Sequence, residues 1–422
     1  MREAAVLIQQ RLVDGQADLV GVEETLKNAA LRDAARLLGN FYSGVLPSVL
    51  GLEQPKGRSS VRTRTILSTL GPIDVTRAYV VDPQARRYFP LDDALGFAGG
   101  CTPAAASLIT WAGAQMGSYD LAGEALCRLA GIGVSGRRVQ RLVNRVAESE
   151  TSWAQARPQE KPTVDILNIQ ADMTGIPMRK EDLVGVEGKN GDPKKRQIKG
   201  GIVFHQTVNA KGEIQRVPGS TTRVVSFDDV PAFATALFTE ASLRGYASTP
   251  TVVFTSDGAE WIWKMVSDRF RGAIQIVDFY HAAEHLGELC HLVEPDQQKA
   301  EALFALRRRL MRDYGAGCVI RYFQAQPPEH PRSKEIQEHL RYFTTNLHRM
   351  DYRRFRQHGY FIGSGAMEGT CKSLVKQRTD LAGQRWHLSG SLNVLRIRAL
   401  VADQLHDRYW KQRATLNLPR AA

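Results

Sequence analysis

The stretch TPTVVFTSDG at residues 249–258 decides the fold, because a short apolar run ends there in an aspartate followed by a glycine. Such a run is typical of a buried strand, and the glycine favours a turn directly after it. Upstream, residues 164–172 (VDILNIQAD) form another apolar run that ends in an aspartate. The surrounding pattern predicts further strands at 201–208, 212–217 and 273–278, and helices at 230–244 and 259–270.

This alternation of strands and helices predicts an α/β core with a sheet of mixed direction, in the order found in ribonuclease H-like folds. Residues 281–356 are rich in Glu, Arg and Leu, are interrupted by QPPEHP at 326–331, and predict an all-helical insertion. Before the core, helical spacing at 21–50 and 103–147 flanks a strand pair at 61–81 that turns at Gly71-Pro72. The N-terminal region is therefore expected to be mixed but mainly helical.

Two carboxylates are expected to converge, because Asp172 and Asp257 each end an apolar strand. Sites in α/β proteins form at that edge of the sheet. Neighbouring carboxylates repel unless a cation lies between them, and Mg²⁺ prefers such oxygen ligands. Glu368, on a helix expected after YFIGSG at 360–365, supplies a third acid. Asp278 also ends a strand and is the rival second acid. The chemistry expected of such a group is phosphoryl transfer on a nucleic-acid backbone.

Three motifs carry a resemblance to a known family: SDGAEWI at 256–262, IVDFYHAAEHL at 276–286 and IGSGAMEG at 362–369. Together they resemble the ISKra-type and ISLre-type bacterial insertion-sequence transposases, relatives of the Mutator-like group in the DDE superfamily. The resemblance covers roughly residues 165–405, and more loosely 119–148 upstream.

The resemblance implies a ribonuclease H-like fold with a helical insertion before the last acid. It implies that Asp172 (in ADMTG), Asp257 and Glu368 are the catalytic and metal-binding residues, with two Mg²⁺ ions that Mn²⁺ can replace. It gives Asp278 and His281 a supporting role. The activity implied is metal-dependent DNA strand cleavage and strand transfer at the ends of the element. Relatives often carry a Cys-x-x-Cys pair after the N-terminal strands, which YVVDPQA at 79–85 lacks.

The charge of the chain suits double-stranded DNA, both element ends and target. The net charge is +12, and residues 371–422 hold 10 Lys and Arg against 3 Asp and Glu, whereas residues 1–160 hold 18 against 16. A solvated helix face is the alternative explanation of such a tail. The candidate phosphate contacts are Lys189, Lys194, Lys195, Arg196, Lys372, Lys376, Arg378 and Arg385.

A helix-turn-helix is expected in residues 119–145. A helical pattern at 119–130 stops at Gly131, and Ser135 is suited to cap a second helix. That second helix would present four arginines to DNA: Arg137, Arg138, Arg141 and Arg145. The alternative is a pair of packed helices with a basic surface.

The chain is expected to begin with a mixed N-terminal domain at 1–118, followed by the helix-turn-helix-like segment and a linker at 119–160. The first part of the catalytic core is expected at 161–280 and the helical insertion at 281–359. The last part of the core, with basic C-terminal helices, is expected at 360–422. Transposases must handle two DNA ends together, so a homo-oligomer, a dimer or larger, is expected. The five cysteines are far apart and form no Cys-x-x-Cys pair. No apolar run is long enough to span a membrane. We therefore expect a cytoplasmic, nucleoid-associated protein.

Two other functions remain open. His281, Glu284 and His285 match the His-x-x-Glu-His pattern of one class of zinc peptidases. A basic tail and a helix-turn-helix would equally serve a non-catalytic DNA-binding protein or an inactive transposase remnant.

Overall fold

A computed structural model describes residues 2–15, 18–52, 58–159, 161, 164–186, 194–325 and 332–414. Lys189, the 326–331 interruption, residues 160 and 162 of the expected linker and the tail beyond 414 lie outside this range. The chain divides into two compact units, one comprising Met1–Trp153 with Gln404–Ala422 and the other Ala154–Asp403. Among the described residues, no helix has both the length and the apolar character needed to cross a bilayer.

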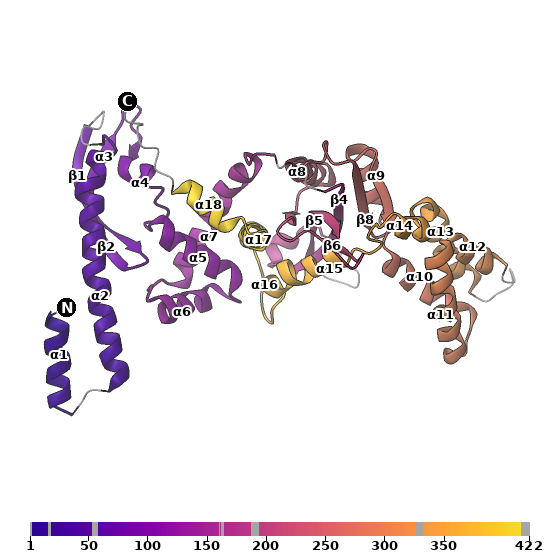
Figure 1. Cartoon of the computed structure of the whole chain (residues 1–422), viewed down its shortest axis with the longest axis horizontal. Coiled ribbons are helices and arrows are strands. Elements are labelled where there is room, and N and C mark those ends of the chain that lie inside the picture. The colour runs from indigo at the N-terminus through magenta and orange to yellow at the C-terminus, as the bar shows by residue number, and fades with distance from the viewer. Residues whose placement is uncertain are drawn as a thin grey trace. The chain divides into compact units, whose positions relative to one another are not determined.

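The first unit is mainly helical and carries a small antiparallel sheet, in which β2 (Gly71–Val81) pairs with both β1 (Arg58–Ser68) and β3 (Arg87–Tyr88). The hairpin turns at residues 69–70, two residues earlier than expected, and Gly71 begins β2. The longest helix, α2, packs along β2 (Figure 1). The helices of this unit are α1 (Arg2–Val13), α2 (Leu19–Asn40), η1 (Phe41–Val45), α3 (Leu46–Val49), α4 (Pro90–Ala94), α5 (Pro103–Gln115), α6 (Tyr119–Ala130), α7 (Gly136–Gln155) and α18 (His406–Arg413).

Helix α6 has the bounds that the sequence predicts, and α7 begins where expected but continues to Gln155. Ser118 caps α6 by accepting a hydrogen bond at Oγ from the backbone N–H of Leu121, at 3.0 Å. Gly131 ends α6 with a positive φ of 67°, a conformation that glycine adopts without strain. Ser135 Oγ accepts from the N–H of Arg138 at the start of α7, at 3.4 Å. Local capping signals therefore suffice to define this helix pair.

The second unit is a mixed α/β structure built on a six-stranded sheet. Its main strand order is β6-β5-β4-β8-β9, with β7 also paired to β5. The ladder between β4 and β5 is antiparallel, whereas those between β4 and β8 and between β8 and β9 are parallel. The strands are β4 (Ile166–Pro177), β5 (Lys195–Val208), β6 (Ile214–Arg216), β7 (Thr222–Ser226), β8 (Thr251–Ser256) and β9 (Ile274–Val277). The mixed direction is as expected, and β7 is additional.

The helices from α8 to α14 share a single buried core with this sheet. Leu167 and Ile169 of β4 belong to the same buried cluster as Phe233 of α8 and Phe343 and Tyr352 of the helical stretch after β9. The expected insertion is therefore helical, but its core is continuous with that of the sheet. The helices concerned are α8 (Val230–Leu243), α9 (Glu260–Arg269), α10 (Phe279–Val293), α11 (Gln297–Tyr314), α12 (Gly317–Gln324), α13 (Ser333–Asn346), η3 (Leu347–Arg349) and α14 (Tyr352–Gln357).

At β5, one face of the sheet is covered by the segment after α14. Ile202 and Phe204 of β5 form a small buried cluster with Met367 and Cys371. Between them along the strand, Val203 faces the large core instead, because side chains alternate along a strand. The elements after α14 are α15 (Gly365–Thr370), η4 (Cys371–Lys376), α16 (Gln377–Thr379) and α17 (Leu388–Ala402), with the short helix η2 (Lys180–Leu183) between β4 and β5.

Two expected boundaries differ from the structure. Strand β4 does not end at Asp172 but continues to Pro177, because β5 pairs with it antiparallel along that whole length. The last helix, α18, was expected with the α/β core but belongs to the first unit. Tyr409 of α18 hydrogen bonds through its hydroxyl to Ser149 Oγ at 2.8 Å, and Thr110 Oγ1 lies 3.3 Å from His406 Nε2, so α18 folds within the first unit.

Gly201 of β5 is tightly covered by α8, and an added Cβ would lie 2.7 Å from Leu237 Cδ1 and 3.3 Å from Phe233 Cζ. We predict that Gly201→Ala lowers the free energy of unfolding by about 1–3 kcal/mol, because buried, packed side chains must shift. Chemical denaturation monitored by circular dichroism measures this change. Gly369→Ala is the control, since nothing lies within 4 Å of its added Cβ. Equal unfolding midpoints for the two variants would contradict the packing described.

Candidate active site

Asp172 lies on β4, and Asp257 directly follows β8, the neighbouring parallel strand. The last ladder pair between β4 and β8 is Gln170 with Thr255. One residue further along, Ser256 donates from Oγ to the carbonyl oxygen of Ala171. One more residue brings Asp172 level with Asp257, on the same face of the sheet as Gln170. The parallel register thus brings these two acids together just beyond the end of the shared ladder.

The environment of Asp172 is unfavourable for a lone carboxylate. Burial and the adjacent carboxylate of Asp257 raise the pKa of Asp172, against the lowering effects of a hydrogen bond from the N–H of Met173, at 2.6 Å, and of His281. Asp257 accepts from the N–H of Ala259 at 3.0 Å, which leaves its second oxygen for another partner. Two such acids are stabilised as a pair when a cation lies between them.

Glu368 reaches the same region from α15. Cys371, one turn after it, is buried and lies with its Sγ 3.9 Å from Asp172 Oδ2. Burial raises the pKa of the Cys371 thiol to about 12, with contributions from the carboxylates of Asp172 and then Glu368. The carboxylates of Asp172 and Glu368 therefore both raise the pKa of the Cys371 thiol, which remains protonated at neutral pH. The Glu368 side chain is 54% exposed, whereas Asp172 is half-buried.

Gln170 fixes the segment that carries Glu368. Its Nε2 donates to the carbonyl oxygen of Gly363 at 3.2 Å, and its Oε1 accepts from the N–H of Met367 at 3.1 Å. The side chain is buried, so these two bonds satisfy both ends of an amide that water does not reach. Because Met367 directly precedes Glu368, the amide sets where the third acid lies relative to Asp172.

Asp278 holds the neighbouring part of the same segment. Its Oδ1 caps α10 by accepting from the N–H groups of Tyr280 and His281, and its Oδ2 accepts from the N–H and the hydroxyl of Ser364. The residue is 1% exposed, and four donors use the lone pairs that a carboxylate offers. This arrangement gives the rival second acid a positioning role.

The ring of Tyr342, on α13 of the insertion, packs next to Asp257. An added Cβ on Gly258 would lie 2.1 Å from Tyr342 Cε2, so the ring packs directly on the residue after the acid. Burial raises the pKa of the Tyr342 hydroxyl, and the carboxylates of Asp257 and Asp278 raise it further. The ring also stacks on His285, with centroids 4.0 Å apart.

His281 faces the acids, but the His-x-x-Glu-His residues do not form the peptidase arrangement. His281 Nδ1 lies 3.3 Å from Glu284 Oε2, and its ring meets that of His285 edge to face at 5.2 Å. The glutamate that would act as the base is thus paired with one of the two histidines. His285 instead turns toward His339 of α13, with their Nδ1 atoms 3.0 Å apart.

One expected DNA contact is not available at the surface. Arg378 is 1% exposed, and its guanidinium lies 4.8 Å from the centroid of the Trp386 ring. The expectation that it contacts phosphate is wrong, because the side chain packs inside the fold beside Trp386. In the first unit, Arg138 donates from Nη2 to the carbonyl oxygen of Gly100 at 3.0 Å, so part of its guanidinium has a structural partner.

The other candidate cations that the structure describes remain at least partly exposed. Lys195 pairs with Asp380 at 2.8 Å, Lys372 lies 3.8 Å from Glu368, and Arg196 donates to the carbonyl oxygen of Asp182 at 3.1 Å. Surface ion pairs of this kind contribute little and are readily exchanged for a phosphate. The exposed candidates are Lys194, Lys195, Lys372, Lys376 and Arg385 in the second unit and Arg137, Arg141 and Arg145 on α7.

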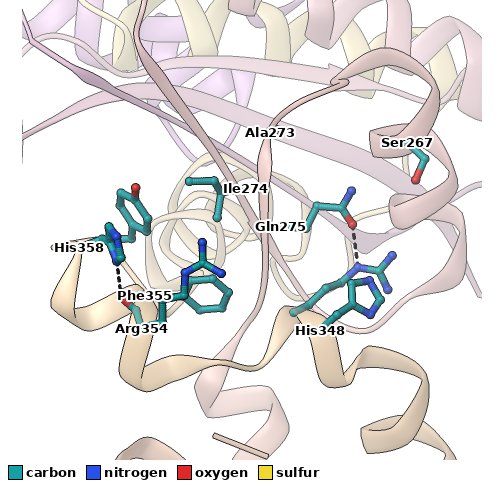
Figure 2. A pocket seen from close by; sticks show the side chains of 10 residues that line it. Ser267, Ala273, Ile274, Gln275, His348, Arg354, Phe355 and His358 are labelled. Atoms are coloured by element: carbon teal, nitrogen blue, oxygen red, sulfur yellow. Dashed lines mark hydrogen bonds between the residues drawn. The ribbon is translucent and has the colours of Figure 1, made fainter.

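A separate pocket of about 440 Å³ lies at the start of β9, whereas the acids lie beyond the end of β8 (Figure 2). Gln275 accepts from Nε of Arg349 at 2.7 Å, and His358 lies with Nδ1 2.8 Å from the carbonyl oxygen of Arg354. Gln275, Arg349 and His358 of its lining are thus engaged in contacts within the fold, and the pocket contains none of the expected catalytic residues.

The comparisons with known proteins are limited. No family model and no curated protein matches the chain. Among solved structures, the chain is similar to the Drosophila P element transposase in its strand transfer complex, at 8% sequence identity and a TM-score of 0.23. The match covers 74% of this chain and 81% of that chain. So low a TM-score carries no weight for the site, which rests on the contacts above.

Sequence reasoning missed the residues that hold the acids in place. Gln170 had a visible signal, since it is a polar residue inside an apolar strand two positions before Asp172. Ser364, Cys371 and Tyr342 had none, because each acquires its role through contacts with residues far away in the chain.

Replacing Gln170 tests its role in holding this segment. We predict that Gln170→Leu lowers the free energy of unfolding by about 1–3 kcal/mol, because the N–H of Met367 and the carbonyl of Gly363 lose their partner. Urea denaturation measures the effect, with Gln337→Leu on the exposed surface of α13 as control. A Gln170→Leu protein as stable as the control would show that the amide does not hold α15.

Proposed function

We propose that this chain is a DDE-type DNA transposase, which cuts DNA strands at the ends of a bacterial insertion sequence and transfers the freed ends to target DNA. One observation carries the proposal: strand register brings Asp257 level with Asp172, and the Gln170 amide holds the segment that carries Glu368. The strand order, with helices inserted before the last acid, also suits a ribonuclease H-like fold. The three motifs that resemble ISKra-type and ISLre-type transposases support the same conclusion.

The donor set fits Mg²⁺. Its candidate ligands are carboxylates, and the repulsion between Asp172 and Asp257 that raises the pKa of Asp172 is what a bound cation would relieve. The nearby Cys371 stays a neutral thiol and does not add a soft ligand. Two bound Mg²⁺ ions, or Mn²⁺ in their place, would supply activation of an attacking oxygen and stabilisation of the leaving oxygen.

The chain's own residues divide the remaining work. Asp172 is held rigidly, because β4 pairs on both sides up to Gln170 and with β5 beyond it. Glu368 is more exposed than Asp172 and is therefore accessible to a DNA substrate. Lys372, one turn after it and 75% exposed, is placed to contact a phosphate next to the cleaved bond.

DNA binding is proposed for the exposed cations of both units. Lys194, Lys376 and Arg385 are candidates for non-specific phosphate contacts, and the outward arginines of α7 for recognition of the element's ends. Because two ends must be joined to one target, the working form is proposed to be a dimer or larger assembly.

Removing the third acid tests catalysis. We predict that the protein nicks DNA carrying the element's ends in Mg²⁺ or Mn²⁺, and that Glu368→Gln reduces the rate at least about a hundredfold, because metal-ion stabilisation amounts to several kcal/mol. Adding EDTA to the native protein should have the same effect. The measurement is nicking of end-labelled DNA resolved on a denaturing gel.

The matched control is Glu301→Gln, an exposed glutamate on α11. It should nick at the native rate, and Glu368→Gln should still bind DNA in a filter assay. Native protein that binds DNA but never nicks it would favour the non-catalytic or remnant alternative. Zinc-dependent peptide cleavage lost in His281→Ala would favour the peptidase.

Neutralising two exposed cations tests DNA binding. We predict that Lys376→Gln combined with Arg385→Gln weakens binding to all DNA sequences alike and lowers the slope of log K against log salt concentration by about 0.9 for each phosphate no longer neutralised. Fluorescence anisotropy across a salt series gives this slope. Lys264→Gln, whose lysine already pairs with Glu260 at 2.7 Å on α9, should leave it unchanged. A slope unaltered in the double variant would exclude these two residues from the DNA surface.

A further inference from the structure

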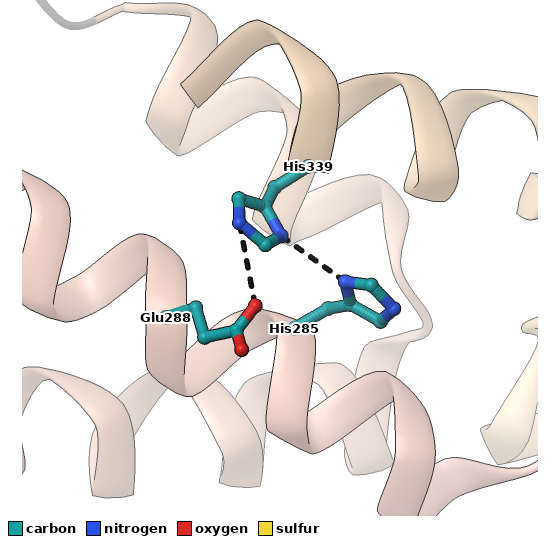
Figure 3. Close-up of side chains that lie close together, drawn as sticks. All are labelled: His285, Glu288 and His339. Atoms are coloured by element: carbon teal, nitrogen blue, oxygen red, sulfur yellow. Dashed lines mark hydrogen bonds and ion pairs between the residues drawn. The ribbon is translucent and has the colours of Figure 1, made fainter. Parts of the chain in front are cut away.

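Three potential metal ligands meet between α10 and α13 (Figure 3). His285 and Glu288, one helical turn apart on α10, face His339 on α13. The Nδ1 atoms of the two histidines are 3.0 Å apart, and Glu288 Oε2 lies 3.3 Å from His339 Nε2. One ligand atom from each of the three residues lies within 4.8 Å of the others. This cluster is not used by the proposed catalytic chemistry.

The chemistry of the cluster favours a transition metal over Mg²⁺. Two imidazoles and one carboxylate form the donor set that binds Zn²⁺ in open sites, where water completes a tetrahedron. Ligand nitrogens about 2.0–2.1 Å from Zn²⁺ in a tetrahedron lie about 3.3 Å apart. The observed 3.0 Å between the histidine nitrogens is close to that spacing.

The surroundings also suit a metal ligand set. The Glu288 side chain is 63% exposed and that of His339 is 20% exposed, so an ion can enter from solvent. His285 is held by stacking on Tyr342, with ring planes 24° apart.

We propose that His285, Glu288 and His339 bind one Zn²⁺ ion, with water in the remaining position, and that this ion clamps α10 to α13. The bound ion fixes the ring of Tyr342, which stacks on His285 and packs against Gly258 beside Asp257. The insertion would thus carry a structural zinc site that steadies one wall of the carboxylate site. This inference does not depend on the proposed catalytic function.

The competing explanation is a hydrogen-bonded chain without a metal. In that arrangement Glu288 accepts from Nε2–H of His339, and His339 Nδ1 accepts from His285 Nδ1–H. The 3.0 Å between the two Nδ1 atoms serves both explanations, whereas the 3.3 Å contact of Glu288 is with Nε2 of His339, which faces away from an ion bound at Nδ1. Binding must therefore be measured directly.

Full-length protein stripped with a chelator and then dialysed should be titrated with Zn²⁺ against a chromophoric zinc indicator, in excess Mg²⁺ to occupy the carboxylate site. We expect one Zn²⁺ per chain and a rise in melting temperature with Zn²⁺, because an ion that binds only the folded state stabilises it. Co²⁺ in its place should give the visible absorption of a tetrahedral site with nitrogen ligands.

Two variants and two controls locate the site. His339→Asn and Glu288→Gln should each weaken Zn²⁺ binding at least about tenfold, since removing a ligand costs no less than removing a residue that only orients one. Glu288 is exposed, so its variant is expected to fold even if His339→Asn does not. His291→Asn, an exposed histidine on the same helix, and Asp257→Asn at the acids should both bind Zn²⁺ as the native chain does.

The proposal is overturned if the native protein binds no Zn²⁺ in excess Mg²⁺. In that case the three side chains form only the hydrogen-bonded arrangement. It is equally overturned if Glu288→Gln binds as tightly as the native chain, or if His291→Asn or Asp257→Asn loses the same affinity. Loss of nicking in Glu368→Gln with Zn²⁺ binding retained keeps the two sites distinct.

Discussion

The acid group depends on one buried amide. Gln170 lies in the middle strand of the sheet, and both ends of its side chain are satisfied at that depth by bonding Gly363 and Met367, nearly two hundred residues later. That constraint pulls the final part of the second unit across the sheet. Asp278 holds the same segment by accepting hydrogen bonds from Ser364. Without these contacts, Glu368 would have no fixed relation to the two aspartates.

The helical insertion also helps to position the acid group. Its side chains belong to the core of the sheet, and Tyr342 lies against the residue that follows Asp257. Anything that fixes α13 therefore fixes one side of the acid group. A metal clamp between His285 and His339 would act at the point where the insertion and the sheet meet, and would differ in ligand chemistry from the carboxylates it supports.

Local patterns predicted much of the structure correctly. The bounds of α6 and the start of α7 followed from their capping residues, and the mixed α/β sheet followed from the spacing of apolar runs. Expectations failed where a long-range partner decided the outcome. Strand β4 runs past Asp172 because β5 pairs with it, and α18 packs with the first unit through contacts such as Tyr409 with Ser149. Arg378, counted as a surface cation, is buried beside Trp386.

The sequence by itself determined the kind of fold and the acids worth testing, because strand periodicity, caps and strand-end aspartates are local features. Only the tertiary structure decided how those acids are arranged: that Asp257 is level with Asp172, that Asp278 is occupied as a positioning residue, and that Gln170 holds the glutamate helix. The histidine cluster was equally invisible, since His339 comes from another helix. The physical reason is common to all of them, because register and buried hydrogen bonds join residues that are far apart along the chain.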